Sequence, residues 1–256
     1  MTVSVEFGRT ATDYARHRAG FPPSFFDRML RWGVGTPGQV LLDLGTGTGT
    51  LARGFAAQGA RVTGLDPDVR MLGQAGELAV SAGLDIRWIA GAAETSGLPD
   101  TSFDVVTSGQ CWHWFDGPVV AREAHRMLRP GGRLVIAHFD WIPLPGNVAA
   151  GTEALIERFN PAWRMGGGDG VHGAWLPVIG AAGFTELETA SWDIAVPYSP
   201  AAWRGRIRAS AGVGATLPTE TVEQFDAALA DLLAVNFPGP ELAVLHRVWF
   251  VTARRA

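Results

Sequence analysis

Residues 41–52, LLDLGTGTGTLA, constrain the fold more than any other stretch of this chain. The apolar run from Val40 to Leu44 predicts a buried strand, and three glycines spaced two apart follow it. A segment that favours a helix begins near Thr50. Strand, tight turn and helix in this order aim main-chain N–H groups and the positive end of a helix into one place, where glycine lets a ligand approach the backbone. The sequence therefore predicts an α/β fold with a small-molecule site at this turn.

The residues of the turn narrow the class of ligand. A phosphate-binding P-loop has the form G-x-x-x-x-G-K-[ST], and this chain contains no lysine because all 21 of its basic residues are arginine. The dinucleotide fingerprint would place a small residue three positions after Gly47, where Thr50 stands. The pattern that fits is D-x-G-x-G-x-G, which begins at Asp43. A carboxylate there repels a pyrophosphate and suits a ligand that carries an ammonium group.

This motif resembles the first motif of the class I S-adenosylmethionine (SAM)-dependent methyltransferases. Three later segments resemble that family in the same order, namely RVTGLDPD, TSFDVVTSGQCWHWF and LRPGGRL. The resemblance is to the type 11 group, similar to trans-aconitate methyltransferase, and in weaker form it covers nearly the whole chain. It implies a Rossmann-like sheet of about seven mostly parallel strands, the last one antiparallel, with helices on both faces and a helical cap. The implied cofactor is SAM, and the implied product is S-adenosyl-L-homocysteine.

A second acidic residue supports the cofactor site. Asp66 ends the second expected strand 23 positions after Asp43, close to the interval at which doubly wound folds present a carboxylate to a ribose. Met71 is expected against the adenine, with a core methionine as the alternative. Ala92 stands where the family often has an aspartate, so adenine recognition is expected from main-chain groups near Ala93. Glu94 is expected either to contact the cofactor or to have a structural role. The expected cofactor-binding residues are Tyr14, Arg18, Asp43, Gly45, Thr46, Gly47, Gly49, Asp66, Pro67, Met71, Ala93, Glu94 and Gln110.

Acceptor-side residues are expected just past the fourth strand. His113 is the candidate catalytic residue, because a histidine there can take a proton at neutral pH or orient the acceptor. The alternative is a histidine held inside the aromatic cluster. His113 and Trp112 are also candidates for acceptor binding, whereas Trp114 is expected to serve packing alone, as is its neighbour Phe115. Arg208 lies four residues after Arg204 on one helical face, which is either solvated or binds an acceptor carboxylate.

The remaining segments predict one methyltransferase domain over residues 1–256. Residues 1–35 are expected to form an N-terminal lid and helices, and residues 36–140 the SAM-binding core. Residues 141–256 are expected to form an acceptor-binding cap and to complete the sheet. Helices are expected over 151–159, 174–182, 200–210 and 219–235, and strands over 185–196 and 245–253. Ser24 is a plausible N-cap for a helix over 23–32.

Composition sets further expectations. A net charge of −4 and a pI near 5.9 argue against a general nucleic-acid binder. One cysteine leaves no intrachain disulfide, and no apolar run of 18 residues or signal-like segment is visible, so a cytoplasmic protein without a membrane partner is expected. The histidines show no metal-ligand spacing, so no metal site is expected. A monomer or homodimer is expected.

These observations predict a SAM-dependent methyltransferase that acts on a small molecule. Three rivals stay open: a methyltransferase of RNA or protein, a nicotinamide oxidoreductase, and a non-catalytic or repurposed SAM-binding protein. The acceptor, and whether its O, N or C atom is methylated, is not predicted. The tryptophan-rich second half favours an aromatic compound, and the resemblance favours a carboxylate.

Overall fold

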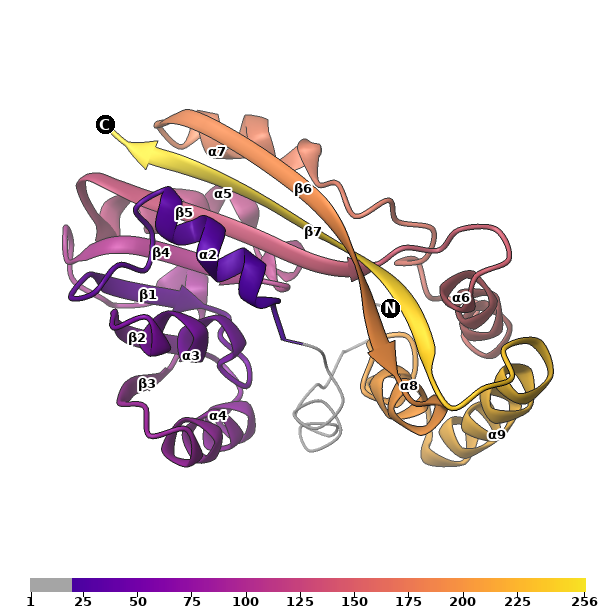
Figure 1. The fold of residues 1–256 in the computed structure, drawn as a ribbon. Helices are drawn as coiled ribbons and strands as arrows, with labels where there is room; N and C mark the ends of the chain where they lie inside the picture. The colour runs from indigo at the N-terminus through magenta and orange to yellow at the C-terminus, as the bar shows by residue number, and fades with distance from the viewer. Residues whose placement is uncertain (1–19) are drawn as a thin grey trace. The chain divides into compact units, whose positions relative to one another are not determined.

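The computed structural model describes residues 20–256, in which seven strands form one sheet in the order β3-β2-β1-β4-β5-β7-β6 (Figure 1). The strands are β1 Val40–Leu44, β2 Arg61–Asp66, β3 Ile86–Ala90, β4 Phe103–Gly109, β5 Leu128–Trp141, β6 Phe184–Tyr198 and β7 Leu242–Arg255. The first five strands pair in parallel. Their apolar runs are typical of parallel strands that helices cover on both faces.

The last strand runs in the opposite direction to its neighbours. Near one end of β7, the Arg255 side chain donates to the Leu128 carbonyl of β5, and near the other end the Ile142 N–H donates to the Leu245 carbonyl at 2.9 Å. The neighbour on its other side, β6, pairs in the same reversed sense, since Arg247 binds Asp193 while Thr185 bonds the Arg254 carbonyl. The expected mostly parallel sheet is therefore confirmed, and so is its antiparallel last strand (Figure 1).

The helices follow the expected order. They are α2 Pro23–Arg31, α3 Thr50–Ala57, α4 Val69–Ser81, α5 Gly117–Met127, α6 Val148–Phe159, α7 Leu176–Ala181, α8 Pro200–Arg208 and α9 Thr219–Asn236, with short 3₁₀ turns η2 Ala93–Thr95, η3 Trp112–Trp114 and η4 Gly173–Trp175. Successive side chains along each strand point to opposite faces of the sheet. Leu42, Leu44 and Ile136 face α5 and α7, whereas on the other face Phe25 of α2 packs with both Phe55 of α3 and Phe250 of β7.

One local expectation was wrong. Ser24 does not cap α2, because Pro22 holds the N-cap position and the Ser24 hydroxyl accepts from the Trp192 indole at 3.3 Å. The sequence Pro130-Gly131-Gly132 comes shortly after α5. β5 begins at Leu128, directly after the helix, and the glycines lie in a bulge where the pairing with β4 jumps from Leu128 to Arg133.

The described residues divide into two compact units. One consists of residues 20–139, 172–192 and 248–256, and the other of residues 140–171 and 193–247. The first unit buries the core between the sheet and α5 and α7. The second is centred on Trp203 of α8, which is fully buried and donates its indole N–H to Thr152 of α6 at 3.0 Å. Within the described residues, no helix is both long enough and apolar enough to cross a bilayer.

Candidate functional site

The glycine turn between β1 and α3 has the geometry that its sequence predicts. Gly45, Gly47 and Gly49 all have positive φ, at 61°, 55° and 77°. A Cβ at Gly45 would lie 2.7 Å from the Cys111 sulfur, and one at Gly49 would lie 2.7 Å from the Trp88 ring. Among the described residues, a Cβ at Gly47 would meet only the Met71 Cε, at 3.4 Å. Two of the glycines are therefore needed for packing, and the middle one leaves open space beside the main chain.

Asp43 and Asp66 stand at the carboxyl ends of neighbouring strands, on the two sides of this turn. Asp66 accepts from the Gly47 N–H at 2.8 Å with one carboxylate oxygen, and from the Asp68 N–H at 2.9 Å with the other. Asp68 in turn caps α4 by accepting from the Arg70 N–H at 2.9 Å. Each oxygen of Asp66 keeps a further acceptor position, because a carboxylate offers about four lone-pair sites. The second carboxylate thus holds the turn and the start of α4 in place.

Asp43 lies deeper, with only 2% of its surface exposed. Its two oxygens accept from the hydroxyls of Thr46 and Thr107, both at 2.7 Å. Burial raises the pKa of the Asp43 carboxyl to about 6, against the lowering effect of the two hydroxyls and the Ala52 N–H. The nearby Asp66 raises it further, and burial also raises the pKa of Asp66 itself. Two carboxyls with raised pKa values beside an open turn favour a ligand that brings positive charge.

The end of β4 closes the other side of the turn. Gln110 has a φ of 67°, which is strained for a residue with a side chain, and its N–H donates to the Ala137 carbonyl at 2.9 Å. The Cys111 thiol lies 3.2 Å from the Leu44 carbonyl and 3.1 Å from the Ser108 hydroxyl. Cys111 therefore fastens this loop to the end of β1, a role that sequence reasoning missed because the family motif treats its position as variable.

The aromatic residues of η3 differ from the sequence expectation. Trp112, expected beside the acceptor, is 2% exposed and belongs to the hydrophobic core, while Trp114, expected to pack, is 42% exposed. His113 is exposed, with its ring centroid 4.6 Å from that of Trp114 and 5.4 Å from that of His138. The burial of the two tryptophans is thus the reverse of what their expected roles require, and the acceptor-side role of the exposed His113 stays a prediction.

Several other predicted residues have clear places. Met71 is buried against Gly47, and Pro67 is exposed between β2 and α4. Glu94 accepts from the Asp116 N–H at 3.1 Å, next to the start of α5, which is the structural role that was its alternative, and Ala93 beside it is buried. Tyr14 and Arg18 lie outside the described residues.

The predicted acceptor-binding arginine has an internal partner. Arg208 binds Asp226 at 2.7 Å, and Arg204 binds the same carboxylate from one helical turn earlier. The shared helical face was predicted correctly. The Arg208 guanidinium, which was the candidate for binding an acceptor carboxylate, instead binds the Asp226 carboxylate of the protein itself.

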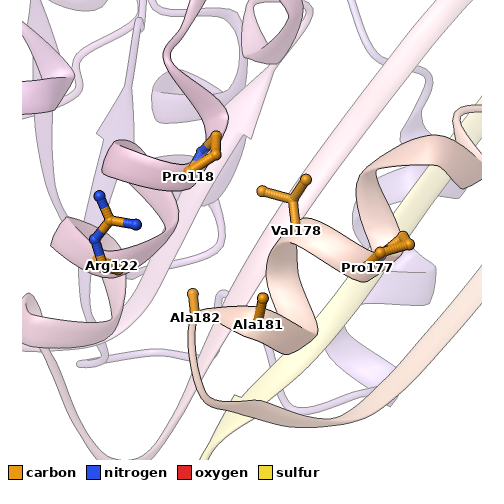
Figure 2. A pocket seen from close by; sticks show the side chains of 6 residues that line it. All are labelled: Pro118, Arg122, Pro177, Val178, Ala181 and Ala182. Carbon is orange, nitrogen blue, oxygen red and sulfur yellow. The ribbon is translucent and has the colours of Figure 1, made fainter.

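Two pockets are formed by residues outside this turn. One of about 250 Å³ lies between α5 and α7, with Pro118 and Arg122 on one side and Pro177 and Val178 on the other (Figure 2). Another, of about 520 Å³, lies at the amino ends of β1, β4 and β5 and includes Asp104. Ligands in open α/β sheets bind at the carboxyl ends of the strands, so neither pocket matches the site predicted from the glycine turn.

Comparison with known proteins gives the same assignment. The type 11 family model described as "Methyltransferase domain" matches residues 42–136. An uncharacterized methyltransferase of Mycobacterium tuberculosis is 36% identical over 132 residues, which cover 52% of this chain and 51% of that protein. The malonyl-[acyl-carrier protein] O-methyltransferase of Serratia marcescens is 30% identical over 189 residues, which cover 73% of this chain and 65% of that protein. The chain thus spans about half the length of the first curated relatives it matches.

A solved structure shows the same fold over most of the chain. The YcgJ protein of Bacillus subtilis superposes with a TM-score of 0.60 at 20% identity, covering 90% of this chain and 97% of that one. Three observations point to the same kind of protein. They are the order of the strands, the glycine turn with its two carboxylates, and the family match over residues 42–136. Residues 42–136 are thus similar to the methyltransferase domain of the type 11 family, and the described residues have the fold of the solved structure that the chain resembles.

Proposed function

We propose that this chain binds SAM at the glycine turn and transfers its methyl group to a small-molecule acceptor. The observation that carries the proposal is the turn itself, where an open Gly47 stands between Asp43 and Asp66 at the carboxyl ends of β1 and β2. Similarity to this family supports the cofactor and the reaction. The Serratia relative is a malonyl-[acyl-carrier protein] O-methyltransferase, which supports methyl transfer to an oxygen atom of the acceptor.

The residues present fit such a cofactor. Asp66 has acceptor positions left for two ribose hydroxyls, since each of its oxygens already accepts one N–H. The raised pKa of Asp43, about 6, reflects a buried carboxylate that a nearby ammonium would stabilise in its charged form. Met71 lies against Gly47, on the side of the turn where the base is expected. The first unit of the fold thus provides an acceptor for each polar end of the molecule.

When bound, SAM supplies an electrophilic methyl group on a cationic sulfur. That positive charge disappears as the methyl leaves, so strong stabilisation of the sulfonium by the protein would oppose the step. The two carboxylates are therefore expected to hold the cofactor by its amino-acid and ribose ends. The strained Gln110 and the loop fastened by Cys111 fix the wall that faces the turn. The chain contributes alignment and exclusion of water, which are the main sources of acceleration in a displacement of this kind.

His113 is the residue we propose at the acceptor. It follows β4 directly, is exposed, and can accept a proton from an attacking hydroxyl or amine at a ring nitrogen. A carboxylate acceptor would need no base, and His113 would then orient it. Trp112 is not carried into this proposal, because its indole is buried in the core. Arg208 is not carried into it either, because it binds Asp226.

An acceptor screen tests the proposal. The purified chain is incubated with SAM and pools of small carboxylates, phenols and amines, and mass spectrometry follows the addition of one methyl group, about 14 Da, together with formation of S-adenosyl-L-homocysteine. Turnover with any pool supports a methyltransferase. Tight SAM binding by calorimetry without turnover in any pool would favour a non-catalytic SAM-binding protein, and binding of NAD in place of SAM would overturn the proposal.

A further inference from the structure

A group of imidazoles lies beside the proposed acceptor residue, and the proposed reaction does not use all of it. His138 of β5 and His172, which directly precedes η4, have ring centroids 4.2 Å apart. Their ligating nitrogens lie within 4.8 Å of each other. His113 is the third member, 5.4 Å from the His138 ring. These residues are far apart in the sequence, which is why their spacing in the chain predicts no metal site.

Both rings of the central pair are held in place by the fold. His138 is 2% exposed and shares its face of β5 with the core residues Leu134 and Ile136, four and two positions earlier. His172 stacks on Trp175 with centroids 4.3 Å apart and planes only 7° from parallel. Trp249 of β7 closes the other side, 5.4 Å from His172. Rings restrained in this way lose little conformational freedom on binding a ligand.

The distance between the two nitrogens suits a metal ion. Bonds from zinc to imidazole nitrogen are about 2.0–2.1 Å long, so two such nitrogens in a tetrahedral site lie about 3.3 Å apart. The two nitrogens, within 4.8 Å of each other, are already close to this separation. Imidazole is a preferred ligand of Zn²⁺, Cu²⁺ and Ni²⁺ and a poor one for Mg²⁺ and Ca²⁺.

We propose that His138 and His172 form a binding site for one divalent transition-metal ion of the zinc class. Two protein ligands leave coordination positions for water or for an oxygen atom of a bound molecule. The site lies next to His113, so an ion held there also places a positive charge at the edge of the proposed acceptor site. The site stands on geometry alone and does not depend on methyl transfer.

The test uses metal binding as its readout. The full chain without a histidine tag is titrated with Zn²⁺ alone in a calorimeter and with Co²⁺ alone in a spectrophotometer, where bound Co²⁺ gives visible absorption. Wild type is expected to bind one equivalent tightly, and His138→Ala or His172→Ala to lose at least about tenfold in affinity. The matched control is His125→Ala, which removes a part-buried histidine of α5 that packs on Phe184 instead. It should bind as wild type does.

A loss of metal binding can be distinguished from a loss of folding and from a loss of catalysis. Circular dichroism and thermal melting are measured for each variant, and His172→Ala is the decisive one if the buried His138→Ala fails to fold. Wild-type affinity in a folded His172→Ala, or no stoichiometric binding to wild type, would overturn the proposal. Failure of SAM binding or of turnover would leave the metal result intact, since neither is part of this measurement.

Discussion

At the scale of single residues, Asp43 makes a pH-dependent prediction. Burial raises the pKa of its carboxyl from 3.8 to about 6 in the folded chain. A raised carboxyl pKa means that folding takes up a proton between about pH 4 and pH 6, so this group's contribution to stability falls as the pH rises through that window and stays low above it. A cationic ligand favours the ionised form, so SAM should bind more tightly above pH 6 and release a proton when it binds below pH 6.

Two measurements check this prediction. Calorimetry in two buffers of different ionisation enthalpy, at pH 5.5 and pH 8, should show proton release only at the lower pH. Asp43→Asn lacks the titration and is the control. Relative to wild type, the free energy of unfolding of Asp43→Asn should be about 2 to 3 kcal/mol higher at pH 7 than at pH 4, from the size of the pKa shift. Identical pH dependence in both proteins would show that Asp43 does not titrate in this range.

Asp66→Ala is expected to weaken SAM binding by about 1.5 to 3 kcal/mol, the scale of hydrogen bonds to a charged group. The variant loses the acceptor for two ribose hydroxyls and also the bond that holds the Gly47 N–H. Asp68→Ala is the matched control, because it removes the cap of α4 and no predicted ligand contact. That control should lower stability by about 1 kcal/mol and leave SAM affinity unchanged. Equal SAM affinity in folded Asp66→Ala and wild type would reject the ribose assignment.

His113→Gln should lower kcat by at least about tenfold while SAM affinity and melting temperature stay near wild type. General-base catalysis by a histidine is typically worth about 10²- to 10⁴-fold, and a purely orienting role less. His125→Gln, a change of the same chemistry at the far end of α5, is the control and should keep full turnover. Full turnover in His113→Gln would remove this residue from the proposed mechanism, and a lost fold would return it to a structural role.

At the scale of elements, the glycine turn allows a comparison of two similar glycines. Gly47 and Gly38 both have positive φ, at 55° and 83°, so an alanine at either should cost about 1–2 kcal/mol in stability. A Cβ at Gly38 meets no heavy atom of the described residues within 4 Å, and Gly38 lies before β1, away from the proposed ligand. Gly47→Ala should therefore weaken SAM binding and Gly38→Ala should not, with Gly47→Val more severe still. Similar SAM affinities in the two alanine variants would contradict the proposed approach of the ligand to Gly47.

Elements were predicted well where local pattern decides them. The strand β1 has the expected bounds, α3 begins at Thr50 and β2 ends at Asp66 as expected, because runs of buried residues and turn residues act within a few positions. The C-terminal segments also agree to within a few residues. The cap of α2 was wrong because Pro22 and Pro23 together fix the start of the helix one residue before Ser24 can act.

The site was predicted less completely, because part of it depends on distant contacts. The positions of the glycines, Asp43 and Asp66 at the turn follow from the motif, and their roles toward a ligand stay predictions. The burial of Trp112 does not follow from a Trp-His-Trp sequence, since a single 3₁₀ turn presents its residues in directions that only the surrounding core decides. The pairing of Arg208 with Asp226 of α9 and the approach of His172 to His138 likewise join segments that no local pattern connects.

At the scale of the whole molecule, ligand binding should appear as thermal stabilisation. SAM at about 100 times its Kd should add about 2.7 kcal/mol by mass action, which corresponds to a rise in Tm of roughly 5–10 °C for a chain of this size. NAD at the same concentration should leave Tm unchanged. Scanning calorimetry of wild type with each ligand measures both, and Asp66→Ala should show a reduced shift with SAM. A larger shift with NAD than with SAM would favour the oxidoreductase rival.

The place of β7 has a consequence for synthesis. This strand is the last in chain order, yet it lies between β5 and β6 and pairs with both. A growing chain that has produced Tyr198 must still add residues 199–241 before β7 begins at Leu242, which at about 5–20 residues per second takes on the order of 2 to 10 s. During that interval the edge of β5 that β7 will cover has no permanent neighbour, and an open edge readily pairs with another chain. Molecular chaperones that bind nascent chains would therefore have the most effect on this protein after β6 has emerged from the ribosome and before β7 has.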